Sequence, residues 1–144
     1  MPYTIPEVIN EVRGLKSMSE LKPESYAEEN GLADSFVQAL ISDQREVPLK
    51  PTQLRKVFHQ IKDMRRQFKH DVPYERAQVA LVMPTLAYAV GRKLIPDDFY
   101  QLMKLCFGQQ RCQSQQDFES AADFLEAIMA YHKYRDGMKK KRED

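Results

Sequence analysis

The stretch LRKVFHQIKDMRRQFKHD, residues 54–71, decides the fold, because apolar side chains recur in it every three or four positions. The recurring residues are Leu54, Val57, Phe58, Ile61, Met64 and Phe68. This period predicts an amphipathic helix of about five turns that buries one face. The helix is expected to start at Pro51-Thr52, with Thr52 as the cap or Pro51 in the first turn, and Pro73 prevents its continuation.

Basic side chains occupy a second strip of this helix, next to the apolar face. At about 100° per residue, a set of them falls within an arc of about 80°. This set, here called the basic stripe, is Arg55, His59, Lys62, Arg66 and Lys69. The stripe is about 21 Å long at a rise of about 1.5 Å per residue. Asp63 projects about 80° from its centre, so no acidic residue lies inside the arc and like charges are not offset there.

Arg65 differs from the stripe, because it projects into the apolar arc beside Phe58. A guanidinium stays charged in that position, so its head group needs a partner that offsets the loss of hydration. We therefore predict that a buried carboxylate or a backbone carbonyl binds its guanidinium.

The rest of the chain also has helical periods, and no β-branched stretch with period-two alternation persists between turn signals. We expect a helix at Ile5–Arg13 and a second of about three turns from Leu32 to the segment 42–48. A further helix is expected at Tyr74–Gly91, with a kink or a new start at Pro84. The last two are expected from Pro96-Asp97-Asp98 to Gly108 and at about 115–135. The polar segment 14–31 is predicted to be a loop or a weak helix. The predicted fold class is all-α: one compact domain, 1–144, forming a bundle of about five to six helices. Residues 1–49 supply acidic N-terminal helices, and 138–144 are expected to be a frayed basic tail.

Charge is distributed unevenly, although the formal net charge is only +1. Residues 1–49 carry four Lys/Arg against nine Asp/Glu, a net of −5; residues 50–93 carry ten against three, a net of +7; residues 94–144 carry eight against nine, a net of −1. A single-signed row of this length suits a polyanion with regularly placed phosphates. We favour a nucleic acid. The second interpretation is an acidic protein partner or the chain's own acidic N-terminal third, and the third is a solvated face without function.

Signatures of catalysis and of metal binding are missing from the sequence. It contains no glycine-rich phosphate loop, no nucleophile elbow and no HExxH motif. Asp97 and Asp98 are explained by the first turn of a helix, where carboxylates meet the positive end of the dipole. Cys106 and Cys112 are expected to be reduced structural thiols, and His132 a hydrogen-bonded structural histidine. We therefore expect neither an enzyme nor a bound metal or cofactor.

Composition and the first residues bear on location. With 42% hydrophobic and 30% charged residues, the chain has the composition of a globular protein, and no apolar run approaches the roughly 18 residues of a membrane span. The start MPYTIPEVINEV lacks the basic and apolar regions of a secretory signal. The expected location is the cytoplasm.

Three segments in order resemble a known family: "PTQLRKVFHQIKDM" (51–64), "MPTLAYAVGRK" (83–93) and "FLEAIMAYHKYRDG" (124–137). They are similar to the small subunit of the type III-A CRISPR effector, the Csm complex. The resemblance covers roughly residues 50–137, whereas the first 49 residues match no motif of the family that we can identify.

The resemblance implies a compact helical bundle without catalytic activity, in an antiviral and anti-plasmid defence complex. Several copies would stack along guide RNA and target RNA, beside the repeated backbone subunits and the large subunit, with no membrane contact. Target cleavage would belong to the backbone subunits, and the nuclease and cyclic-oligoadenylate activities to the large subunit. The alternative is a helical adaptor that binds an acidic protein partner through the basic helix 51–70.

The expected RNA-binding residues come from the family motifs and from the stripe. The motifs carry over to Arg55-Lys56, to Arg92 with the following Lys93, and to Lys133. The complete set is Lys50, Arg55, Lys56, His59, Lys62, Arg66, Lys69, Arg92, Lys93 and Lys133. We expect contacts to the sugar–phosphate backbone with little base preference. No aromatic row interleaves with the stripe, which argues against base stacking as the main mode; Tyr88 and Tyr131 are expected to pack with their hydroxyls hydrogen-bonded.

Overall fold

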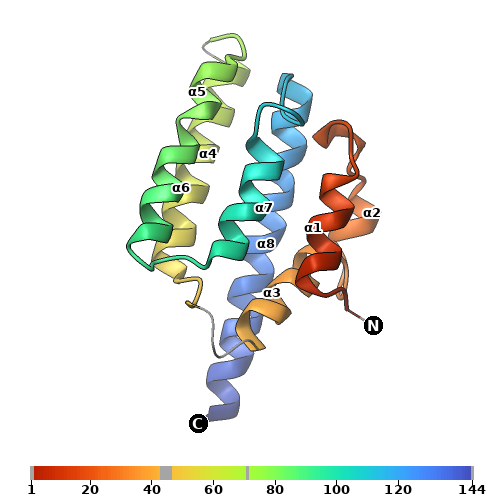
Figure 1. Ribbon diagram of the computed structural model, residues 1–144, viewed down its shortest axis with the longest axis vertical. Coiled ribbons are helices and arrows are strands. Elements are labelled where there is room, and N and C mark those ends of the chain that lie inside the picture. Colours follow the sequence, from red (N-terminus) through yellow and green to blue (C-terminus); the bar gives the residue numbers. More distant parts are fainter. Residues whose placement is uncertain (1, 43–46, 71, 144) are drawn as a thin grey trace.

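The computed structural model describes residues 2–42, 47–70 and 72–143, the last five of them by their backbone alone. These residues form helices and no strand (Figure 1), which confirms the all-α prediction. In chain order the elements are α1 (Ile5–Arg13), the 3-10 helix η1 (Met18–Glu20), α2 (Pro23–Tyr26), α3 (Leu32–Ser42), α4 (Pro51–His70), α5 (Arg76–Ala80), α6 (Val82–Gly91), α7 (Asp97–Phe107) and α8 (Gln115–Glu143). The helices outnumber the five or six expected, because 74–91 divides into two and α2 forms within the polar segment.

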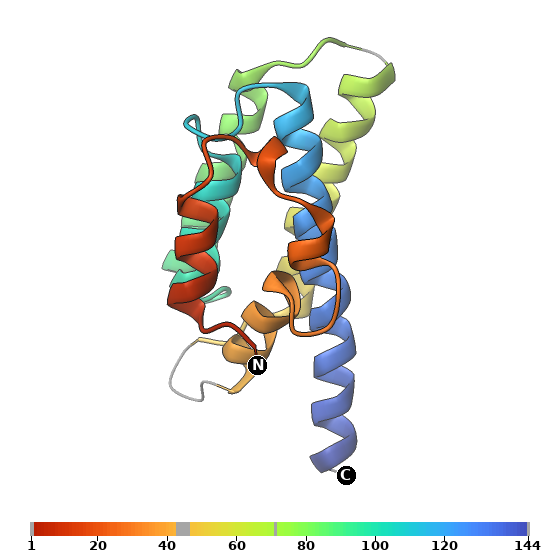
Figure 2. The same ribbon diagram turned by 90° about the vertical axis from the view of Figure 1, so that its right-hand side faces the viewer.

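The long α8 is the centre of the bundle. It packs against α3, α4, α7 and η1, while α6 packs on α4 and α7, and α1 packs on α3 and α7. Figure 1 shows α4, α5 and α6 on one side of α8 and α1 and α2 on the other. Figure 2 shows the C-terminal part of α8 extending beyond the other helices. Phe118 of α8 joins the layers, since its ring contacts Phe68 of α4 and Phe107 of α7 edge-on at centroid distances of 5.4 and 6.0 Å.

Helix ends follow local chemistry where the sequence predicts them. Thr4 and Glu7 form a reciprocal capping box at the start of α1. Pro51 is the first residue of α4, so the first-turn alternative is the correct one. The first turn of α7 contains Asp97 and Asp98, as predicted, and Gly108 caps its other end. The predicted end of α3 lies partly outside the described residues, because 43–46 are not among them.

Two predictions about helix ends are wrong. The break in 74–91 falls at Leu81 rather than at Pro84, which is the third residue of α6. Proline has no N–H and its ring conflicts with the carbonyl four residues earlier, so α5 ends at Ala80 and a new helix begins. The segment after Gly137 is not frayed but continues α8 to Glu143. A single glycine costs a helix only about 1 kcal/mol, and no proline follows it.

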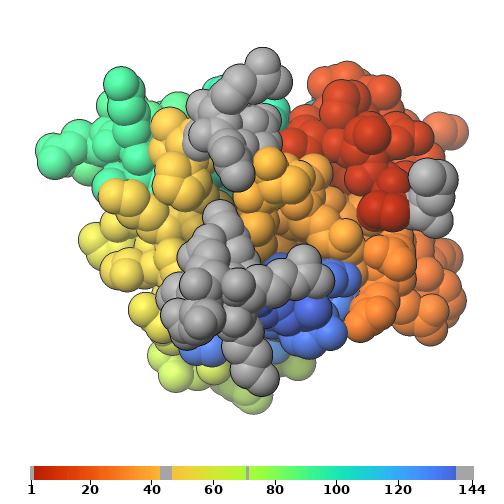
Figure 3. Space-filling model, turned by 90° about the horizontal axis from the view of Figure 1, so that it is seen from below, coloured from red at the N-terminus to blue at the C-terminus, as the bar shows by residue number. Residues whose placement is uncertain are grey.

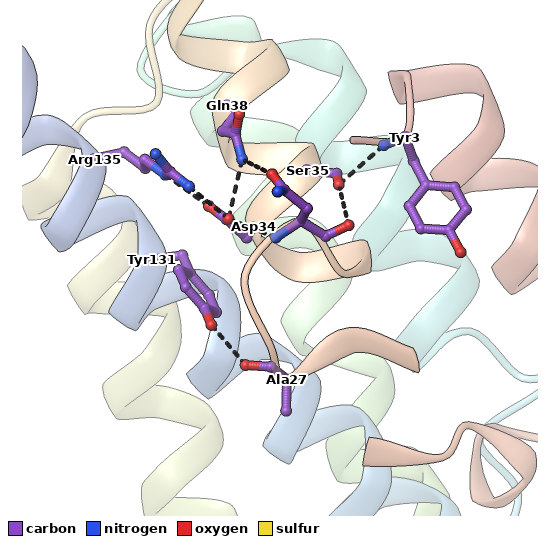
Figure 4. A network of polar contacts seen from close by, with 8 residues as sticks. Tyr3, Ala27, Asp34, Ser35, Gln38, Tyr131 and Arg135 are labelled. Atoms are coloured by element: carbon purple, nitrogen blue, oxygen red, sulfur yellow. Dashed lines mark hydrogen bonds and ion pairs between the residues drawn. The ribbon is translucent and has the colours of Figure 1, made fainter. Parts of the chain in front are cut away.

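A buried polar network holds α3 against α8 (Figure 4). The Asp34 side chain is fully buried and accepts two hydrogen bonds from the Arg135 guanidinium, at 2.8 and 2.7 Å. The Asn30 backbone N–H and the Gln38 amide donate to the same carboxylate. Nearby, the Tyr131 hydroxyl donates to the Ala27 carbonyl at 2.7 Å, as predicted for that tyrosine. The N-terminal third therefore attaches to α8 rather than to α4.

Candidate nucleic-acid interface

All five residues of the basic stripe are exposed on the outer face of α4. The opposite face is buried against α8 and α6. Its buried residues are Leu54, Val57, Ile61, Met64 and Phe68. The period of the sequence therefore places core and stripe on the sides of the helix that it predicts.

One acidic residue does reach the stripe. The Arg66 guanidinium lies 3.1 Å from the Asp63 carboxylate, one helical turn away on the same surface. Both side chains are largely exposed, so the pair contributes little to stability. Among the side chains of residues 2–42, 47–70 and 72–138, no carboxylate forms a salt bridge with Arg55, Lys62 or Lys69. Among the described residues of the N-terminal third, therefore, no ion pair supports the interpretation in which that segment neutralises the stripe.

Arg65 is bound by carboxylates, as predicted, and these come from α8. Its guanidinium contacts Glu119 and Asp123 within hydrogen-bond distance and lies 3.9 Å from Glu126. The partners are partly exposed rather than buried, because they follow the solvent-facing edge of α8. We call Glu119, Asp123 and Glu126 the acidic row. It borders the stripe along one side, and its spacing of four and three residues on one helix face is visible in the sequence although our prediction missed it.

A second group of expected residues lies where α6 ends and α4 begins. The Lys50 backbone N–H donates to the Leu94 carbonyl at 3.5 Å, which brings the start of α4 beside the turn that contains Arg92 and Lys93. Figure 3 shows this turn and the start of α4 side by side at one edge of the molecule. The three basic side chains are exposed, as is Lys56 on α4.

Lys133 of α8 lies near the stripe at the N-terminal end of α4. A cleft of about 750 Å³ separates the first turns of α4 from α8, and its lining includes Arg55, Lys133, His132 and Asp136. His132 is 5% exposed. Burial lowers its pKa, against the opposing effects of Asp136 and of a hydrogen bond with the Leu49 backbone. The burial and this hydrogen bond agree with the structural role predicted for this histidine. Of the expected residues outside the stripe, Lys50, Arg92 and Lys93 thus lie together at the start of α4, and Lys133 lines the same cleft as Arg55.

The prediction that the Tyr88 side chain packs inside the protein is wrong. Instead of packing in the core, its side chain is 65% exposed on the outer face of α6, although its hydroxyl does accept a hydrogen bond from Arg92 Nη1 at 3.2 Å. A helical projection would have shown this, because Tyr88 points about 130° away from the buried Val82, Leu86 and Ala89.

The cysteines are free and buried, as expected. Burial raises the pKa of Cys112 to about 11 and raises that of Cys106 as well, so both thiols stay protonated at neutral pH. In the part of the chain that the structure describes, no three His, Cys, Asp or Glu side chains are grouped so that they could hold a metal ion. None of the described helices has the length and apolar character needed to cross a membrane.

A comparison with protein-family models matches residues 26–138 to Csm2 Type III-A. The matched span is 113 of the 144 residues. The chain belongs to the Csm2 type III-A family. This confirms the resemblance read from the three motifs, and it identifies the chain with the family of small subunits of the type III-A CRISPR Csm complex. Csm2 membership implies assembly with the other subunits of that complex and with its guide RNA.

The Csm2 match also corrects one expectation. It begins at residue 26, so the family region includes α3 and the statement that the first 49 residues match no family motif is wrong for residues 26–49. No curated protein and no solved structure matches the chain in the corresponding comparisons.

Proposed function

We propose that this chain is the non-catalytic, RNA-binding small subunit of a type III-A effector and that its basic stripe contacts the sugar–phosphate backbone. Several copies stack along the guide RNA and target RNA. The observation that carries the proposal is the stripe itself: exposed cations over about 21 Å of one helix, of which only Arg66 has a salt bridge within the described residues.

Phosphate recognition explains why this row needs no partner inside the protein. Guanidinium and ammonium groups form strong charge-assisted hydrogen bonds with phosphate oxygens. Such contacts fix the position of the protein but carry no sequence information. In a guide–target duplex the base pairs read the sequence, so a backbone contact without base preference is sufficient.

The acidic row restricts where the RNA lies. Phosphates above α8 would approach Glu119, Asp123 and Glu126, which Arg65 neutralises only in part. Phosphates on the other side of the stripe approach Lys56 and, towards the start of α4, the turn with Arg92 and Lys93. We therefore place the RNA over the side of α4 that faces away from α8, which leaves Lys133 of α8 at the margin of this interface.

The test is fluorescence anisotropy with a labelled single-stranded RNA of arbitrary sequence, titrated from 50 to 300 mM salt. Each phosphate contact contributes about −0.7 to the slope of log K against log salt for a single strand. The triple variant Arg55→Gln, Lys62→Gln, Arg66→Gln should bind more weakly and should have a slope that is shallower by about 2.

A matched control removes the same charge from exposed positions elsewhere: Lys16→Gln, Lys22→Gln, Lys104→Gln. The proposal expects the control to retain most of the affinity and both triple variants to melt near the wild type. Equal losses in the two variants would mean that net charge, not the stripe, governs binding. Absence of binding by the wild type at 50 mM salt, with no RNA retained in the assembled complex, would favour the adaptor for an acidic protein.

A further inference from the structure

The end of α6 presents an exposed aromatic ring beside two cations. Tyr88 is 65% exposed. Arg92 holds the edge of this ring, since its Nη1 donates to the hydroxyl at 3.2 Å and its guanidinium carbon lies 5.8 Å from the ring centroid. The exposed tyrosine is therefore anchored at one point while most of its surface remains open to solvent.

The backbone at Lys93 is in an unfavourable conformation for a lysine. Its φ of 59° lies in the left-handed region. The Leu94 N–H donates to the Ala89 carbonyl and the Lys93 N–H to the Val90 carbonyl, both at 2.9 Å, which is the hydrogen-bond pattern of a Schellman C-cap. Glycine usually occupies this position because it adopts a positive φ without steric cost. A lysine at this position therefore carries a conformational cost that a glycine would avoid.

The surroundings favour a negatively charged ligand with an apolar face. Arg92 and Lys93 form no salt bridge with any described residue, and Lys50 lies beside them at the start of α4. From Ala77 to Gly91 the chain contains no charged residue, so nothing acidic on α6 competes with a phosphate near Tyr88.

We propose that Tyr88 stacks against one unpaired base of the bound RNA while Arg92 and Lys93 hold the adjoining phosphate. Stacking on an aromatic ring tolerates any base, because every base has a π face. The base must be unpaired, since a base inside a duplex already stacks on its neighbours. This inference rests on the proposed function, in that RNA is the ligand, and it adds a base contact to the backbone contacts of the stripe.

The experiment uses the full chain and a short single-stranded RNA that carries 2-aminopurine, whose fluorescence is quenched when it stacks. Wild-type protein should change the quenching of at least one labelled position. Tyr88→Leu should abolish that change and weaken binding about fivefold or more. Tyr88→Phe keeps the ring and should keep both signals within about twofold.

Tyr134 provides the matched control. It is 47% exposed, and the Arg135 guanidinium lies 5.2 Å from its ring centroid, so the pair resembles Tyr88 with Arg92. Arg135, however, is engaged by Asp34. Tyr134→Leu should therefore leave quenching and affinity unchanged.

Lys93 is tested by Lys93→Gly, which removes the charge and relieves the unfavourable φ. The variant should melt at the wild-type temperature or slightly above it and should bind RNA more weakly. Wild-type affinity in Lys93→Gly would overturn the role of this lysine.

The outcomes separate this inference from the proposed function. If Tyr88→Leu changes the 2-aminopurine fluorescence as the wild type does, while the triple variant of the stripe still loses affinity, the stacking site is refuted. The proposal that the stripe binds RNA is then retained. If Tyr88→Leu keeps quenching but no longer assembles with the other Csm subunits, Tyr88 is a protein contact and the inference is wrong. If the wild type binds no RNA at all, both proposals fail.

Discussion

Replacement of Arg135 with methionine tests the energetics of the polar network between α3 and α8. Methionine keeps much of the side-chain volume but removes the cation and its two hydrogen bonds to Asp34. The Asp34 carboxylate, 0% exposed, is then left with the Asn30 N–H and the Gln38 amide as donors. The variant therefore buries a charge without a counter-charge.

Breaking a buried ion pair by removing one partner costs about 3–5 kcal/mol. The lower end applies here, because two donors remain and Arg135 is itself 21% exposed. We expect the free energy of unfolding to fall by about 3 kcal/mol at pH 7. Asp34→Ala should lower the free energy of unfolding by less, because Arg135, which then lacks its partner, is close enough to the surface to be hydrated.

The loss should depend on pH. In the wild type, burial raises the pKa of Asp34, but hydrogen bonds from Arg135, Asn30 and Gln38 outweigh it, so the pKa is below its ordinary value. Stability from this carboxylate is present above the unfolded pKa of about 4 and is lost as the pH falls through the lower folded pKa. Without Arg135, protonation of Asp34 relieves the buried charge. The wild type and Arg135→Met should therefore converge in stability as the pH is lowered towards 4.

The measurement is guanidinium chloride unfolding of both proteins between pH 4 and 7, followed by circular dichroism. Arg13→Met is the control. Among the described residues, its guanidinium bonds only an exposed Asn10 side chain, so it should contribute less than about 0.5 kcal/mol. A loss in Arg135→Met that is the same at every pH would refute the charge argument. It would show that the arginine acts by packing, for instance over the Tyr134 ring.

Three further predictions concern other contacts. Arg65→Met should lower the free energy of unfolding by about 1–2 kcal/mol, less than Arg135→Met because its carboxylates are partly exposed; an unchanged denaturation midpoint would contradict this. Gly108→Ala should destabilise by about 1–3 kcal/mol, since the added Cβ would overlap the Lys104 carbonyl oxygen, and wild-type melting would show that the turn adjusts. Cys106 and Cys112 should react with a thiol reagent at pH 8 only after unfolding, because burial keeps them protonated; rapid labelling of the folded protein would refute it.

Features set by neighbours along one helix could be predicted from the sequence. The core and the exposed stripe of α4 follow from a 3.6-residue period, which requires no knowledge of the other helices. The proline rule likewise predicted a break near Pro84, but its position at Leu81 depends on which carbonyl the ring displaces. The pairing of Asp63 with Arg66 was missed because the side chains reach further than the projected arc.

Contacts between distant segments could not be predicted in the same way. The projection showed that Arg65 needs a partner, but the choice of Glu119 and Asp123 depends on how α4 crosses α8, and these residues are 54 and 58 positions away. Asp34 looks like an ordinary first-turn carboxylate of α3. Only the packing of α3 on α8 shows that it is buried against Arg135, 101 positions later in the chain.

Four arginines of this protein divide by the origin of their partners, and that division separates stability from function. Arg65 and Arg135 are held by carboxylates of another helix, so their charge is used within the fold. Arg55 and Arg92 have no such partner among the described residues and lie on the outer faces of α4 and at the end of α6. Neutralising the first pair should lower stability with little direct effect on RNA, whereas neutralising the second should weaken RNA binding at constant stability. A variant of Arg55 that unfolds the protein, or one of Arg135 that weakens RNA binding without loss of stability, would show that the division is drawn in the wrong place.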